Sequence, residues 1–218
     1  MSKEEMIQRF EELLLAVGRE GIGKLLEFIR KSDFYDAPAS TRFHGSHQGG
    51  LLEHSLNVYE CLVNKEDNST WAEYYKTVDG DSFVIVALLH DICKTYFYSM
   101  EIKNQKTYDA DKVQAAEKWQ VKHDNNGNFI WETVPAYVVE DKIPYGHGEK
   151  SVMMIEEYIK LKPAERYAIR WHMGPYSGQQ DWNTLGAAME KYPLILALFE
   201  ADMEATRLVE NKEDGKDE

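Results

Sequence analysis

The sequence predicts an all-α protein, a helical bundle that carries one small inserted β-hairpin. Apolar residues recur at helical spacing over most of the 218-residue chain. Residues 95–145 interrupt that spacing, and within them Asn-Gly separates two strand-like runs, which is typical of a hairpin. Hydrophobic residues make up 43% of the chain and aromatic residues 12%, so the chain can bury a core.

The helices follow from the apolar periodicity and from the glycines and prolines that interrupt it. The glycine-rich segment 18–23 ends a first amphipathic helix, and the Gly-, Ser- and His-rich residues 36–50 indicate a loop. Residues 67–82 are expected to form a connection with a short helix. The expected helices cover residues 3–17, 24–32, 51–63, 83–94, 151–161, 163–173 and 193–209.

We expect one main domain with a helical N-terminal part. Residues 1–35 would pack on the bundle of residues 36–209, and residues 210–218 form an acidic tail. The hairpin is expected at about residues 115–135, where KWQVK and FIWETV flank HDNNGN. The His-Asp pair inside HDNNGN is interpreted as part of the turn.

The composition excludes several classes of partner. A formal net charge of −13 argues against a long nucleic acid, because proteins that neutralise many phosphates are usually basic. The longest apolar run, FVIVALL, is too short to cross a bilayer. There are two cysteines and no secretory signal, so we expect a soluble, cytoplasmic protein.

Polar residues occur on helix faces that should be buried. Asp202 shares a face with Ile195 and Leu198, and His54 lies between Leu51 and Val58. His90 follows one turn after an apolar stretch. Because buried charges are tolerated mainly when they are paired or bind metal, three such helices predict a shared site.

Two further histidines stand at helix ends. His147 lies between two glycines just before a helix, and His172 ends the helix that Gly174 and Pro175 terminate. Imidazoles together with carboxylates suit divalent ions such as Mn, Fe, Co, Ni or Zn.

Five segments occur in a characteristic order: FHGSHQGGLLEHSL, ALLHDICK, PYGHGEKSV, AIRWHMG and FEADMEA. Over roughly residues 40–207 they resemble the HD superfamily of metal-dependent phosphohydrolases, whose ordered signature is H…HD…H…H…D. The resemblance implies a compact helical bundle with one or two divalent ions (Mn, Fe, Ni, Co, Zn or Mg) at its centre. It assigns ligand roles to His54, His90, Asp91, His147, His172 and Asp202. Asp91 would bridge two ions, with His147 and His172 as the ligands that allow the second.

The resemblance also implies an activity. Two ions can clamp a phosphoryl group and activate a water molecule that attacks phosphorus in line with the leaving oxygen. We therefore expect a phosphomonoesterase or phosphodiesterase that acts on a nucleotide or a similar small phosphorylated substrate.

Other residues are candidates for catalysis or for substrate binding. Asp91, Lys94 and His47 are expected to be catalytic, and Lys94, His44 and His47 to bind phosphate or protonate a leaving group. Lys94 could equally be a lysine at a helix C-terminus, and the two loop histidines could cap the next helix. Lys150 and Arg170 are further phosphate-binding candidates, with surface charges as the alternative. Cys93, where many HD proteins have glycine, is interpreted as a small buried thiol.

Two alternative functions remain. GGLLEHSL is similar to the catalytic part of HD-type 3′-to-5′ exoribonucleases, so short oligonucleotides are alternative substrates. A regulatory protein that binds metal and nucleotide without turnover is the other. The hairpin could cover the site or form the contact of a homodimer, and the sequence leaves both open.

Overall fold

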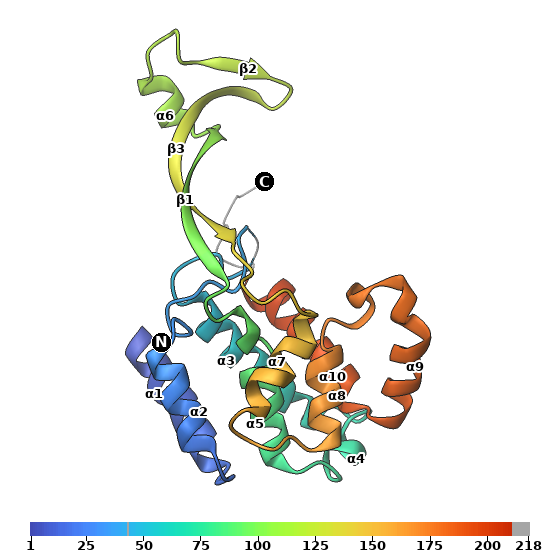
Figure 1. Ribbon diagram of the computed structural model, residues 1–218. Coiled ribbons are helices and arrows are strands. Elements are labelled where there is room, and N and C mark those ends of the chain that lie inside the picture. Colours follow the sequence, from blue (N-terminus) through green and yellow to red (C-terminus); the bar gives the residue numbers. More distant parts are fainter. Residues whose placement is uncertain (43, 211–218) are drawn as a thin grey trace. The chain divides into compact units, whose positions relative to one another are not determined.

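The computed structural model describes residues 1–42 and 44–210 and divides the chain into two compact units. One unit combines Met1–Tyr98 with the chain from Glu140 onward, and the other is Ser99–Val139. The first unit is helical and the second contains the sheet (Figure 1). A mostly helical chain with a small β insertion confirms the predicted fold class at that level. Of the predicted acidic tail, residues 211–218 lie outside the described residues.

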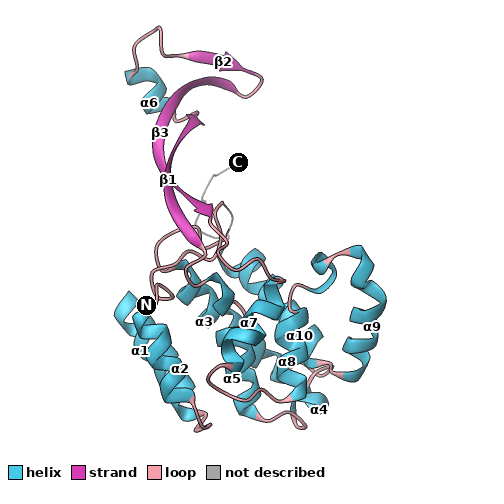
Figure 2. Ribbon diagram, viewed as in Figure 1, coloured by secondary structure: helices cyan, strands magenta, loops and turns pink. Residues whose placement is uncertain are grey.

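Most helices of the first unit lie close to the segments where apolar periodicity predicts them (Figure 2). The exception is α9, which lies in a segment where no helix was expected. Within residues 1–42 and 44–210, no helix combines the length and the apolar character that crossing a bilayer requires. The α-helices are α1 Lys3–Ala16, α2 Ile22–Lys31, α3 Gly50–Val63, α4 Ala72–Tyr75, α5 Gly80–Leu89, α7 His147–Glu156, α8 Pro163–Trp171, α9 Trp182–Lys191 and α10 Leu194–Glu204. The short 3-10 and π turns are η1 Asn64–Asp67, η2 Ile92–Lys94, η3 Gly174–Ser177, η4 Gln179–Asp181 and η5 Ala205–Val209.

The helix expected to run to Lys94 ends earlier. Asp91 has φ −106° and ψ 16°, outside the helical region, so α5 ends at Leu89 and the 3-10 turn η2 holds Lys94. The sequence predicted that Lys94 and His90 share one helix, and the structure shows that they do not. The break places Asp91 between α5 and η2, so that Asp91 belongs to neither helical segment.

The core forms where the helices that carry the predicted ligands pack against one another. Helix α3 packs on α5 and α10, and α8 packs on α5, α7 and α10. Their apolar faces are fully buried, as at Leu51, Ile85 and Leu198. Gly148 allows α7 to approach α8, because a Cβ there would lie 2.3 Å from the carbonyl oxygen of Arg170. That close approach brings the N-terminus of α7 to the C-terminus of α8.

A buried ion pair fixes the other end of α8. The carboxylate of Glu165 is fully buried and accepts two hydrogen bonds from the guanidinium of Arg19, at 2.7 and 2.9 Å. It also accepts hydrogen bonds from the Ser82 hydroxyl and from the backbone N–H of Lys162, each at 2.7 Å. Because both oxygens have partners, this buried charge is fully satisfied within the chain.

The second unit is a three-stranded sheet with one short helix. Its strands are β1 Tyr98–Thr107, β2 Lys122–Asp124 and β3 Gly127–Val139, in the order β1-β3-β2, and its helix is α6 Ala110–Ala115. Strands β2 and β3 pair antiparallel, with Asp124 opposite Gly127, so the turn lies within the predicted HDNNGN segment. His123 and Asp124 belong to β2 and not to the turn, because they pair with Asn128 and Gly127, so that part of the prediction was wrong. Strand β1 and helix α6 were not expected. Strand β1 is mostly polar and exposed, so it shows no apolar alternation that would indicate a strand.

Candidate metal centre

The six residues predicted as metal ligands converge in the helical unit. Helices α3, α7 and α10 contribute one each, the two residues that follow α5 contribute two, and the residue that follows α8 contributes one (Figure 1). They are His54, His90, Asp91, His147, His172 and Asp202. Four of them are at most 3% exposed, namely His54, His90, Asp91 and His172. Residues far apart in the sequence thus form one buried cluster, here called the Asp91 cluster.

Asp91 lies at the centre of the cluster, and its two carboxylate oxygens face different histidines. Oδ1 lies 2.7 Å from His147 Nε2 and 3.5 Å from His172 Nε2. Oδ2 lies 3.4 Å from His90 Nε2 and 3.7 Å from His54 Nε2. Two groups of imidazoles are therefore joined through a single carboxylate.

Asp202 completes the group on the Oδ2 side. Its Oδ1 atom lies 3.3 Å from His54 Nε2. The ligand atoms of His54, His90 and Asp202 all lie within 4.8 Å of one another, as do those of His90, Asp91 and His172.

Each of the four histidines is held through its other ring nitrogen. Nδ1 of His90 lies 2.8 Å from the carbonyl oxygen of Ala87, and Nδ1 of His172 lies 2.7 Å from that of Ile169. His54 Nδ1 lies 2.9 Å from a carboxylate oxygen of Glu210. His147 Nδ1 contacts the Cys93 sulfur at 3.2 Å. All four rings thus direct Nε2 into the cluster, as metal-ligating histidines do.

Two of these Nε2 atoms are buried without a hydrogen-bond partner. Among the described residues, His90 Nε2 and His172 Nε2 have none. Because their Nδ1–H groups donate to backbone carbonyls, each Nε2 presents a lone pair near the anionic Asp91. Buried nitrogen lone pairs beside a carboxylate are costly unless a cation lies between them. The donor set of imidazoles and carboxylates therefore fits a divalent transition-metal ion.

Burial and neighbouring charged groups shift the pKa values of the cluster in opposite directions. Burial lowers the pKa of His54, but hydrogen bonds with Asp202 and Glu210 outweigh it and raise the pKa to about 10. Burial also lowers the pKa of His147, but the charge of Asp91 and the hydrogen bond to Asp91 outweigh burial and raise this pKa to about 9. Burial raises the pKa of Asp91, but the charge of Lys94 and the contact with His147 hold it well below its usual value. The carboxylates stay anionic, and metal binding would release protons from His54 and His147.

Lys94 and His44 both reach the cluster. The Lys94 ammonium lies 2.6 Å from Asp91 Oδ2. Burial lowers the pKa of Lys94, but the Asp91 carboxylate outweighs burial and raises this pKa, so Lys94 remains cationic. The ring of His44 lies 4.9 Å from that of His54. Burial, followed by the charge of His54, lowers the pKa of His44 to about 4, so this ring is neutral near pH 7.

Three predicted substrate-binding residues lie elsewhere or have other partners. His47 is exposed and contacts Gln48 and Glu53. The buried Lys150 ammonium lies 2.7 Å from Asp141. Arg170 pairs with Glu149 and lies over the ring of Trp171. The structure does not bring these three side chains to the cluster.

Glu210 is the residue that sequence reasoning missed. It was assigned to the acidic tail, yet its carboxylate is almost buried and contacts His54 and the side-chain amide of Asn57, the latter at 3.1 Å. The π turn η5 follows α10 and returns the chain to α3. No local pattern in the sequence signals this position, because the π turn between α10 and Glu210 departs from α-helical spacing.

One comparison with known proteins supports a phosphoester hydrolase in general. Over 75 residues the chain is 37% identical to the dihydroneopterin 2′,3′-cyclic phosphate phosphodiesterase of Methanocaldococcus jannaschii. The aligned part covers 34% of this chain and 28% of that relative, so the chain spans under a third of the relative's length. No family model and no solved structure matches the chain.

Proposed function

We propose that this protein is a metal-dependent phosphohydrolase of the HD type that cleaves a phosphoester bond of a nucleotide or a similar small substrate. The observation that carries the proposal is the pair of buried, unpartnered imidazole nitrogens of His90 and His172 beside Asp91. A purely structural cluster would satisfy these atoms within the chain, because unpaired buried polar groups are destabilising.

The residues divide into two sets that would each hold a divalent ion. His54, His90 and Asp202 surround the Oδ2 side of Asp91, and His147 and His172 surround its Oδ1 side. When bound, such ions supply Lewis acidity, which polarises phosphoryl oxygens and lowers the pKa of a water ligand.

The chain's own groups would position the substrate. Lys94 keeps a positive charge beside Asp91 and is 12% exposed, so it can bind a phosphoryl oxygen and stabilise the charge that grows there during hydrolysis. The neutral ring of His44 can donate one hydrogen bond and accept another. Burial of the cluster excludes bulk water, which strengthens these interactions.

The partial relative favours a diester as substrate, since its printed name specifies a 2′,3′-cyclic phosphate. In such a reaction one water adds to phosphorus, one P–O bond of the ring breaks, and a monophosphate remains. The net charge of −13 also favours a small substrate over a long nucleic acid.

The test is hydrolysis of 2′,3′-cyclic AMP and of bis(p-nitrophenyl) phosphate by protein loaded with Mn²⁺, Co²⁺, Ni²⁺ or Zn²⁺. We expect turnover with at least one ion, its loss on chelation, and a decrease of roughly a thousandfold in Asp91→Asn. Metal binding without turnover of either substrate would contradict the hydrolase proposal and favour a regulatory protein.

A further inference from the structure

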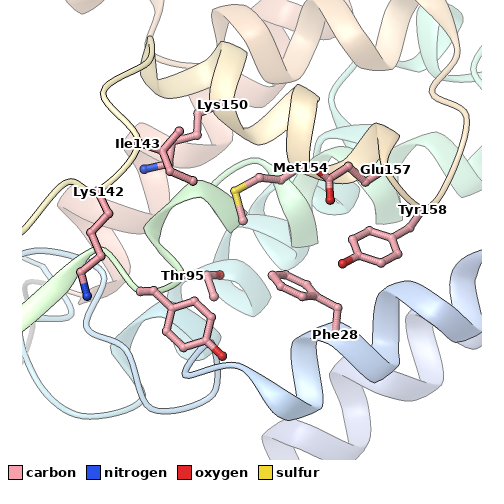
Figure 3. Close-up of a pocket in the computed structure, with 9 residues that line it drawn as sticks. Phe28, Thr95, Lys142, Ile143, Lys150, Met154, Glu157 and Tyr158 are labelled. Carbon is pink, nitrogen blue, oxygen red and sulfur yellow. The ribbon is translucent and has the colours of Figure 1, made fainter.

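A separate pocket lies beside the Asp91 cluster in the same helical unit. Its volume is about 390 Å³, within the range of about 300–1,000 Å³ that small-molecule sites occupy. Its walls come from α2, from the two residues that follow η2, from residues 142–143, and from α7 and the residues after it (Figure 3). None of the six predicted metal ligands lines it.

Three of the nine residues that line the pocket are aromatic, namely Phe28, Tyr96 and Tyr158. Phe28 and Tyr158 stack on one another, with ring centroids 5.4 Å apart and an angle of 26° between the planes. Met154 also lines the pocket (Figure 3), and its thioether suits contact with a flat ring. Such walls favour a planar, polarisable ligand over an aliphatic one.

Thr95 supplies an unused polar group. Its side chain lines the pocket and is 5% exposed, and its hydroxyl has no hydrogen-bond partner among the described residues. Lys150, by contrast, already pairs with Asp141 and lies 5.0 Å from the ring of Phe97. A buried hydroxyl without a partner is destabilising. Because the oxygen itself is buried, a ligand in the pocket would reach it after rotation of the Thr95 side chain, and a hydrogen bond there would remove that cost.

Tyr96, which lines the pocket, has a strained backbone conformation. Tyr96 has φ 55°, in the left-handed region that non-glycine residues rarely adopt. Its backbone N–H donates to Asp33 at 2.8 Å, and its hydroxyl donates to the carbonyl of Lys31 at 3.2 Å. Strain that is held by contacts at both ends is typical of binding sites.

We propose that this pocket binds a small planar heteroaromatic ring that hydrogen-bonds to the Thr95 hydroxyl and packs against Phe28, Tyr96 and Tyr158. The ring could belong to the phosphoester substrate or to a separate small molecule. Thr95 directly follows Lys94, and Lys150 lies one turn after His147 on α7, so the pocket and the Asp91 cluster share two segments.

The first test measures binding directly by isothermal titration calorimetry. The probes are four phosphate-free ring compounds: adenosine, guanosine, uridine and neopterin. We expect at least one to bind the full chain with a stoichiometry near one. The variant Met154→Trp fills the pocket and should weaken that binding at least tenfold. Met153→Trp is the matched control, because Met153 is 41% exposed and is not among the lining residues.

The second variant separates a binding role from a structural one. Thr95→Val keeps the shape of the side chain but removes the hydroxyl. We expect binding to weaken about threefold to tenfold, as for one lost neutral hydrogen bond, while the midpoint of thermal unfolding stays the same or rises. A structural role for the hydroxyl would instead lower that midpoint and leave binding unchanged.

The two sources of the ring are distinguished by kinetics. A ring compound that raises KM for 2′,3′-cyclic AMP without changing kcat occupies the place of the substrate's ring. One that changes kcat, or binds without affecting turnover, marks a separate ligand. The proposal is overturned if none of the four compounds binds at millimolar concentration, or if Met154→Trp and Met153→Trp bind alike. These binding results do not depend on hydrolysis, so failure of the hydrolase proposal is detected separately.

Discussion

The helical unit buries two clusters of charged side chains, one around Glu165 and one around Asp91. Around Glu165, both carboxylate oxygens accept hydrogen bonds from Arg19 and other groups of the chain. Around Asp91, the imidazoles of His90 and His172 point unpartnered nitrogens at a carboxylate. The first cluster is complete within the chain, and we propose that a cation completes the second. Burial alone therefore does not distinguish the two clusters, whereas their hydrogen bonding does.

The largest expected effect on folding comes from breaking the complete cluster. Glu165→Ala leaves Arg19 without its buried partner and should lower the free energy of unfolding by about 3–5 kcal/mol. Urea denaturation measures this loss. Metal content per folded chain should stay unchanged, because Glu165 has no contact with the Asp91 cluster among the interactions described above. A loss of metal with unchanged stability would reverse the roles of the two clusters.

Within the Asp91 cluster, Lys94 should affect turnover but not metal binding. Lys94→Met keeps the length of the side chain and removes the positive charge that lies 2.6 Å from Asp91. We expect turnover to fall about a hundredfold, as for the loss of one group that stabilises a transition-state charge. Metal content should not fall, because the ammonium competes with a cation for the same oxygen. A normal rate would show that Lys94 only balances the charge of Asp91.

Glu210 should have a smaller effect, through the orientation of His54. Glu210→Gln weakens the hydrogen bond to Nδ1 and should lower metal affinity about tenfold. Competition with a fluorescent chelator measures the affinity. Glu204→Gln is the matched control, since Glu204 pairs with Lys65 rather than with a histidine. Equal affinities in the two variants would contradict a positioning role for Glu210.

The smallest effect is a dependence of stability on pH. Burial raises the pKa of Glu165, but hydrogen bonds from Arg19 and Ser82 outweigh it and lower the pKa below its ordinary value of 4.5. The contribution to stability is therefore complete above about pH 4.5 and is lost as the pH falls through the lowered pKa. The difference in unfolding free energy between wild type and Glu165→Gln should be constant near pH 7 and shrink below pH 4.5. A difference that grows on acidification would be inconsistent with this sign.

The sequence predicted most of the helices, with α9 as an exception, because they depend on local patterns. Local patterns together with the resemblance predicted the set of candidate ligands. His54 and Asp202 interrupt apolar helix faces, and such interruptions are visible without a structure. Their convergence agrees with the prediction, while their role as metal ligands remains a proposal. The end of α5 at Leu89 was not visible, because nothing in HDIC signals the backbone change at Asp91.

The residues that sequence reasoning placed less well depend on tertiary contacts. Lys150 and Arg170 were candidates for phosphate binding, but each has a carboxylate partner, Asp141 or Glu149, that its sequence neighbours do not specify. Glu210 was taken for solvated tail because the π turn that returns it to α3 has no sequence signature. The pocket around Thr95 likewise depends on how α2 and α7 pack.

The central claim, that the Asp91 cluster is completed by divalent cations, is tested most directly by elemental analysis. Wild type and the variants Asp91→Asn and Glu165→Gln would be purified without a histidine tag, loaded with Mn²⁺, Co²⁺, Ni²⁺ or Zn²⁺, and dialysed. We predict one to two ions per chain in wild type and in Glu165→Gln, and a large loss in Asp91→Asn. If wild type retained no metal, or if Asp91→Asn retained as much as wild type, the claim would be contradicted.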